Sequence, residues 1–174
     1  GNVEKLPTNE ATNRPDADDG KDLNILLLGS DKGEPKKGQS KTTTIAEDAV
    51  AEEWPSGKYR SDTLMVVHIS AARDKIHLVS IPRDSFVSLY DEKGAEIEKG
   101  KINAAFSLSG PNGAVSTVEQ LTGLRMNHVA IIDWEGFKDL SKAVGGVPVN
   151  IPESFYDPKQ KVQWDAGEQV LKGN

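Results

Sequence analysis

The chain has 174 residues and a formal net charge of −6, with 36% hydrophobic and 28% charged residues. This length suffices for one α/β domain with a core, and the acidic balance argues against nucleic acid as a partner, since proteins that bind a phosphate backbone usually present a basic face. The sequence contains no cysteine, which excludes disulfides and thiolate chemistry, and no run of about 18 apolar residues that would span a membrane.

A polar segment precedes the first predicted strand. Residues 1–22 contain two prolines and no apolar periodicity, which predicts a flexible tail or stalk. Because residue 1 is glycine, we interpret this start as a boundary within a longer protein. Residues 23–29 are almost wholly apolar and predict a strand buried on both faces in the middle of a sheet. Asp31 follows this strand, at the end where ligands collect in open α/β sheets.

Residues 32–59 form a polar segment that we interpret as an inserted surface element. Within it, Thr44 and Glu47 have the spacing of a capping box. This spacing predicts a short helix from Thr44 to Trp54, which Pro55 ends.

A β-hairpin is predicted after this insertion. Residues 62–70 and 73–81 are two runs rich in β-branched and apolar residues, and only a short turn separates them. With so short a turn, Arg60 is expected opposite Arg83 across the ladder. Two arginines at one end of a hairpin repel each other unless an anion lies between them.

Two aspartates flank the same end of the predicted hairpin. Asp62 and Asp84 would lie among the arginines, and such an arrangement suits a phosphate or pyrophosphate chelated with a divalent metal. The alternative for Arg83 is a surface ion pair with Asp84, which contributes little to stability. Asp31, taken alone, is better explained as a residue that caps a turn.

Strands and helices alternate through the rest of the chain. The predicted elements are strand 86–90, helix 101–108, helix 114–121, strand 128–132, helix 134–144 and strand 147–151. Residues 110–113 separate the first two helices, Gly123 closes the second, and Asp133 caps the third. Residues from Pro152 onward are interpreted as loop. The alternation predicts a three-layer α/β/α sandwich with a mixed central β-sheet flanked by helices.

Three single side chains complete the interpretation. Lys101 stands at the start of a predicted helix, where the helix dipole disfavours a cation. We take this as a sign of function, although a solvated lysine is the commoner case. Trp134 and Phe137 have helical spacing and are assigned to the core, and strand 128–132 is expected to be buried.

A set of motifs now carries a family resemblance. In order along the chain these are NILLLGSD, RSDTLMVVHI, SIPRDSFV, KINAAFSLSGP, TVEQLTGL, HVAIIDWEGFKDL and VGGVPVNIPE. Together they resemble the LytR-CpsA-Psr family of bacterial cell-wall enzymes. The resemblance covers residues 23–174 and implies a catalytic domain that is incomplete at its C-terminal end, since the family carries further arginines and a glutamine downstream. Residues 32–59 are longer than the corresponding stretch of the family.

The resemblance implies a phosphotransferase outside the cytoplasmic membrane. Such an enzyme moves a glycopolymer of the teichoic acid, capsular polysaccharide or arabinogalactan type from a polyprenyl-pyrophosphate carrier to peptidoglycan. It also implies an N-terminal transmembrane anchor that is absent from this sequence. Two alternatives use the same residues. One is a phosphatase or pyrophosphatase acting on prenyl pyrophosphates, and the other is a non-catalytic module that binds polyprenyl phosphate.

The resemblance also implies roles for individual residues. Asp31 and Asp62 would bind a Mg²⁺ ion, or Mn²⁺ in its place, that bridges the pyrophosphate. Arg60 and Arg83 would bind the phosphate oxygens and act in catalysis together with Asp62, and Lys101 would bind the same head group. Asp84 would orient the neighbouring loop. Asp62 or Asp84 would accept the proton of the acceptor hydroxyl.

Overall fold

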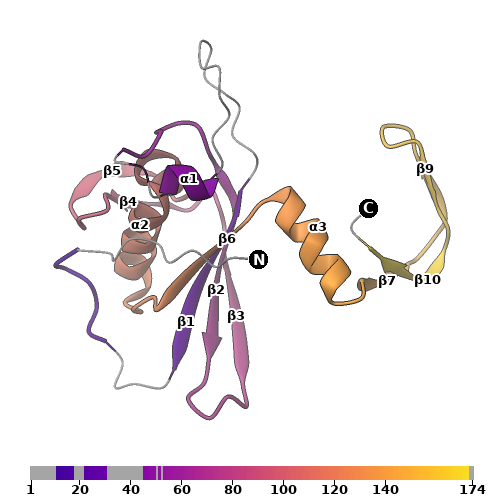
Figure 1. Cartoon of the computed structure of the whole chain (residues 1–174), viewed down its shortest axis with the longest axis horizontal. Helices are drawn as coiled ribbons and strands as arrows, with labels where there is room; N and C mark the ends of the chain where they lie inside the picture. The colour runs from indigo at the N-terminus through magenta and orange to yellow at the C-terminus, as the bar shows by residue number, and fades with distance from the viewer. Residues whose placement is uncertain (1–10, 18–21, 31–44, 50, 52, 173–174) are drawn as a thin grey trace. The chain divides into compact units, whose positions relative to one another are not determined.

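In the computed structural model, a four-stranded mixed sheet is the centre of the first of two units, which comprise residues 1–132 and 133–174 (Figure 1). The structure describes residues 11–17, 22–30, 45–49, 51 and 53–172. The elements of the first unit are β1 Leu23–Ser30, α1 Ile45–Ala49, β2 Ser61–Ile69, β3 Ile76–Ile81, β4 Phe86–Tyr90, β5 Glu96–Lys101, α2 Asn103–Thr122 and β6 His128–Ile132. The mixed sheet and its helices confirm the predicted α/β class.

The sheet has the strand order β3-β2-β1-β6, so β1 is an interior strand as predicted. It pairs antiparallel with β2 and parallel with β6. Leu26 and Leu28 are fully buried, whereas Ile25 and Leu27 on the other face are only half-buried. The prediction that β1 is buried on both faces was therefore wrong, and so was the prediction of a buried β6, whose residues are half-buried or exposed.

The β2–β3 hairpin forms, but its register differs from the predicted one. Leu64 lies opposite Ile81, which by continued antiparallel counting brings Asp62 level with Arg83. The prediction that Arg60 faces Arg83 was therefore wrong by two residues. The physical reason is a longer turn, in which the Ser70 N–H donates to the Lys75 carbonyl and Arg73 adopts a left-handed backbone with φ of 60°.

Strand β5 was not predicted from the sequence. Its residues EIEKGK are mostly charged and exposed, so they show no alternation of apolar and polar residues. It pairs antiparallel with β4, through a turn at Asp91–Gly94. Lys101 is consequently the last residue of a strand, and the prediction that it begins a helix was wrong.

Helix α2 supplies much of the core and contains the predicted break. Ser109 and Gly110 have non-helical backbone angles, and Pro111 follows directly. Phe106 before the kink and Val118 after it are fully buried. Gly123 ends the helix in a left-handed conformation, with its N–H bonded to the Glu119 carbonyl, as the sequence indicated.

Gly110 is expected to tolerate no side chain. Its φ is +66°, and an added Cβ would lie 2.8 Å from the ring of Trp54. Gly110→Ala should therefore destabilise the chain by about 2 kcal/mol, from backbone strain and overpacking together. Gly123→Ala is the control for positive φ, because φ is +69° there and nothing lies within 4 Å, but its ψ of 8° strains alanine less than the ψ of −162° at Gly110. Urea unfolding of both variants measures the difference, and an equal loss would contradict a role for the Trp54 contact.

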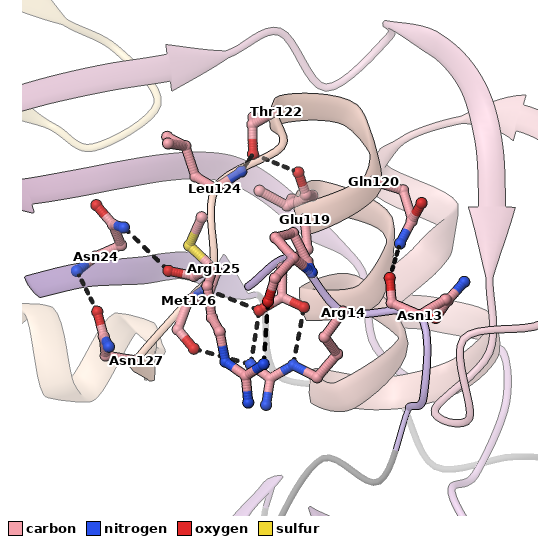
Figure 2. Close-up of polar contacts among 12 residues, drawn as sticks. Asn13, Arg14, Asn24, Glu119, Gln120, Thr122, Leu124, Arg125, Met126 and Asn127 are labelled. Carbon is pink, nitrogen blue, oxygen red and sulfur yellow. Dashed lines mark hydrogen bonds and ion pairs between the residues drawn. The ribbon is translucent and has the colours of Figure 1, made fainter. Parts of the chain in front are cut away.

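The N-terminal segment 11–17 packs onto the first unit, although the sequence predicted a flexible tail for residues 1–22. The Arg14 guanidinium donates to both carboxylate oxygens of Glu119, at 2.9 and 2.6 Å, and also to the Met126 carbonyl (Figure 2). Glu119 is fully buried, and its hydrogen bond and charge raise the pKa of Arg14. The prediction was therefore wrong for residues 11–17, because a long-range ion pair holds them.

Two further hydrogen bonds hold the same segment. Gln120 donates its side-chain amide to the Asn13 carbonyl at 2.6 Å (Figure 2). Arg125 donates to the Pro15 carbonyl at 3.0 Å. The folded body of the first unit consequently includes residues well before the strand at which the sequence placed its start.

The second unit contains one helix and two small antiparallel pairs. Its elements are α3 Trp134–Ala143, β7 Val147–Ile151, β8 Phe155–Asp157, β9 Val162–Trp164 and β10 Gly167–Leu171. Asp133 caps α3 by accepting the Gly136 N–H, as predicted. Trp134 and Phe137 stack on each other but are 64% and 47% exposed, so their assignment to the core was wrong. The loop predicted from Pro152 onward was also wrong, because β7 pairs with β10 and β8 with β9.

Candidate functional site

Two ion pairs lie together beside the end of β3. Arg83 Nη1 lies 2.7 Å from Asp62 Oδ1, and Lys101 Nζ lies 3.0 Å from Asp84 Oδ1. All four side chains are about half exposed, so solvent and solutes reach them. The structure thus brings together four of the residues that the sequence assigned to a site.

Backbone hydrogen bonds fix the turn that carries Arg83 and Asp84. The Ser85 N–H donates to the Pro82 carbonyl at 3.0 Å, which closes the turn between β3 and β4. The Ile102 N–H donates to the Ser85 carbonyl at 2.9 Å, and the Asn103 N–H donates to the Arg83 carbonyl at 3.2 Å. The turn is therefore joined to the start of α2, which brings Lys101 beside it.

Arg60 projects from a well-anchored backbone. Its neighbours Tyr59 and Ser61 are 2% and 0% exposed, whereas Arg60 itself is exposed. The Tyr59 hydroxyl donates to Asp48 at 2.7 Å, and the Ser61 hydroxyl donates to the Thr63 carbonyl at 2.9 Å. Among the residues that the structure describes, Arg60 has no hydrogen-bond or ion-pair partner, and the β2–β3 register does not place it opposite Arg83.

The hydrogen-bond acceptor of the Tyr59 hydroxyl is Asp48 of α1, a contact that the sequence did not predict. Asp48 accepts from the buried Lys58 ammonium at 2.6 Å as well as from Tyr59. Burial of the Tyr59 phenol raises its pKa; burial lowers the pKa of Lys58, but hydrogen bonds to Asp48 and Tyr59 raise it overall. The only sequence signal was the capping-box pattern, which predicted a helix here but not that its Asp48 would support the residue before Arg60.

The electrostatics of the cluster keep Asp84 ionised. Its hydrogen bond to Lys101, the charge of Lys101 and the charge of Arg83 together lower the pKa of Asp84 below its ordinary value. A carboxylate of lowered pKa is a weak base. Asp84 is consequently better suited to orienting a cation than to accepting a proton.

The structure does not describe every residue of the predicted site. Asp31 lies outside the described residues, as does Thr44 of the predicted capping box. Within the described ranges, no group of three or more histidine, aspartate or glutamate side chains is arranged to hold a metal ion. In the same part of the chain, no helix has the length and apolar character needed to cross a membrane.

The arrangement suits recognition of a polyanion at a solvent-accessible surface. Arg83 offers a planar set of N–H donors that fits phosphate oxygens, and Lys101 adds a point charge beside it. Asp62 uses Oδ1 toward Arg83, and no described residue bonds its Oδ2. A Mg²⁺ ion is usually held by one or two carboxylates together with water and phosphate oxygens, so Asp62 is chemically compatible with one.

The sequence matches the LytR_cpsA_psr family over residues 2–174. It is 37% identical over 150 residues to the probable cell wall biosynthesis protein LcpB of Corynebacterium glutamicum, covering 86% of this chain and 33% of that protein. It is 35% identical over 121 residues to the polyisoprenyl-teichoic acid–peptidoglycan teichoic acid transferase TagV of Bacillus subtilis, covering 67% of this chain and 30% of that protein. The chain thus spans about a third of the length of these relatives.

Solved structures show the same fold. The crystal structure of B. subtilis TagV has a TM-score of 0.63 at 30% identity, over 88% of this chain and 52% of that one. The structure of TagT with bound octaprenyl pyrophosphate lipid has a TM-score of 0.64 at 20% identity, over 95% and 59% of the two chains. The second likeness concerns the fold alone.

Proposed function

Because the chain belongs to the LytR-CpsA-Psr family, we propose that it is part of a phosphotransferase that moves a glycopolymer from a polyprenyl-pyrophosphate carrier to peptidoglycan. The observation that carries the proposal is the cluster beside β3, where Arg83 and Lys101 lie next to Asp62 and Asp84. The names of the relatives TagV and TagU, which are teichoic acid transferases acting on peptidoglycan, support the same chemistry.

In this proposal the cations bind the pyrophosphate head group. Arg60, Arg83 and Lys101 would hold phosphate oxygens and stabilise the negative charge that develops on the departing prenyl phosphate. Asp62 would accept the proton of the attacking sugar hydroxyl, because the lowered pKa of Asp84 disfavours proton transfer to that residue. Asp84 would orient the neighbouring loop and pair with Lys101 while no head group is bound.

A divalent cation is the proposed cofactor. Asp62 would hold it through Oδ2, with Asp31 as a second carboxylate ligand. Mg²⁺, or Mn²⁺ in its place, would supply positive charge that neutralises part of the charge of the phosphate groups. We expect Asp31→Ala to remove the dependence of pyrophosphate affinity on Mg²⁺, whereas Asp139→Ala on α3 should leave it unchanged. Calorimetric titrations with and without Mg²⁺ measure this, and a metal dependence retained in Asp31→Ala would place the ion elsewhere.

The proposed site of action is the extracellular face of the cytoplasmic membrane. The relative LcpB is named a probable cell wall biosynthesis protein, and TagV is named a transferase of teichoic acid to peptidoglycan. The proposal includes an N-terminal transmembrane anchor upstream of this sequence. Protease treatment of intact cells that produce the whole protein tests the location. A chain that is protected until the membrane is opened would contradict it.

The direct test supplies a polyprenyl-pyrophosphate-linked glycopolymer and Mg²⁺, with and without a peptidoglycan oligomer, and identifies products by mass spectrometry. A phosphodiester-linked product that forms only with the acceptor supports the transferase. Release of the polymer without an acceptor would indicate a prenyl-pyrophosphate phosphatase or pyrophosphatase. Binding without turnover would indicate a lipid-phosphate binding module. Absence of binding would remove the basis for all three.

A further inference from the structure

The three cations of the site differ in whether they already form an ion pair with an aspartate. Arg83 and Lys101 each bind an aspartate, at 2.7 and 3.0 Å, whereas Arg60 has no such partner in the described part of the chain. Each ion pair occupies only part of the N–H donors of its cation, but it offsets the positive charge that would attract phosphate oxygens. A ligand can reach Arg60 without meeting a paired carboxylate, whereas it competes with a carboxylate at the other two cations.

We propose that Asp62 and Asp84 are internal competitors of the phosphate ligand, which occupy Arg83 and Lys101 until a polyanionic head group displaces them. The inference rests on the proposed function, since it concerns the same site. Exchange is feasible because the four side chains are 46–62% exposed, and ion pairs at that exposure are weak. A pyrophosphate carries more charge than one carboxylate, so it is the stronger partner for both cations.

Asp84 gives the clearer test of the two aspartates. Asp62 is also a proposed metal ligand, so its removal would change affinity for two opposing reasons. Asp84 has no proposed contact with the metal, and its Oδ1 lies 3.0 Å from Lys101 Nζ, a contact that lowers the pKa of Asp84. The turn around Asp84 is held by the backbone bonds from Ile102 to Ser85 and from Asn103 to Arg83, which an asparagine leaves intact.

The experiment titrates inorganic pyrophosphate into the chain and its variants by calorimetry, in buffer with EDTA. Asp84→Asn is expected to raise the affinity by about threefold, which is the scale set by an exposed ion pair. Glu96→Gln is the matched control. It removes one negative charge at the far end of β5, about 17 Å from Lys101 along the strand, and should leave the affinity nearly unchanged.

A double-mutant cycle separates exchange from a general charge effect. In the Lys101→Met background, Asp84→Asn should bring no gain, because the cation over which the two anions compete has been removed. A gain of the same size in both backgrounds would overturn the proposal. So would an unchanged or lower affinity of Asp84→Asn in a chain that binds pyrophosphate through Arg83.

The outcomes also distinguish this inference from the proposed function. Binding that needs Arg83 but does not respond to Asp84→Asn leaves the function standing and rejects the competition. Binding that appears only in Asp84→Asn supports the competition. A chain in which neither the parent nor Asp84→Asn binds pyrophosphate contradicts both.

Discussion

Replacing Arg83 with alanine is expected to weaken binding of a polyprenyl pyrophosphate severely while leaving the fold intact. Arg83 contacts Asp62, the residue that we propose both as a metal ligand and as the proton acceptor. The planar N–H donors of Arg83 can also hold two phosphate oxygens at once. The loss of such charge-assisted hydrogen bonds reduces affinity by about 100-fold. Stability should change by less than about 1 kcal/mol, because the ion pair with Asp62 is half exposed.

Calorimetric titration and a thermal melt of the same variant measure these two quantities. Lys75→Ala is the matched control, since it removes one cation from the opposite end of the same hairpin. Arg83→Lys should recover only part of the affinity, because an ammonium lacks the planar set of donors. An affinity of Arg83→Ala equal to that of the parent would reject the site assignment. Loss of the fold in this variant would contradict the surface role assigned to Arg83.

Arg14→Ala is expected to cause the largest loss of stability, about 3–5 kcal/mol, because it leaves the fully buried Glu119 carboxylate without its cation. The carboxylate would keep one protein hydrogen bond, from the Met126 N–H at 2.8 Å. That bond replaces neither the charge nor the two N–H groups of Arg14. Urea unfolding monitored by circular dichroism measures the change.

Arg125→Ala is the matched control for Arg14→Ala. It removes an arginine that binds the same segment, but through a single hydrogen bond to the Pro15 carbonyl, so we expect a loss of about 1 kcal/mol. Combining Arg14→Met with Glu119→Gln should restore part of the stability, because it removes the buried charge and keeps an acceptor for Met126. Equal losses in Arg14→Ala and Arg125→Ala would show that the buried charge is not the cause.

The sequence predicted those elements whose signals are local. The strands Phe86–Tyr90 and Val147–Ile151, the Asp133 cap and the Gly123 helix end all depend on neighbouring residues, and all are confirmed. Strand β5 was missed because its pairing with β4 comes from the turn geometry and not from an apolar pattern of its own. The small strands after Pro152 were missed for a related reason, since their residues are mainly exposed.

The clustering of the site was predicted for a partly incorrect reason. The hairpin register was shifted by two residues, which preserves the face on which each side chain lies. Arg83 consequently remains at the end of the hairpin but meets Asp62 instead of Arg60. The Asp84–Lys101 pair depends on β5 and the start of α2 coming back to the turn, so no local pattern indicated it. The roles of Arg60 and Asp31 in binding stay predictions.

The docked segment 11–17 has a consequence for mechanical load. Tension applied to the chain before residue 11 would reach the first unit through Asn13 and Arg14, which bind Gln120 and Glu119 in the C-terminal half of α2. The load would therefore be carried by a buried helix and a bidentate ion pair before it reached β1. Strand β1 would be shielded from peeling away from its neighbours β2 and β6, and the sheet that carries the site would keep its register under tension.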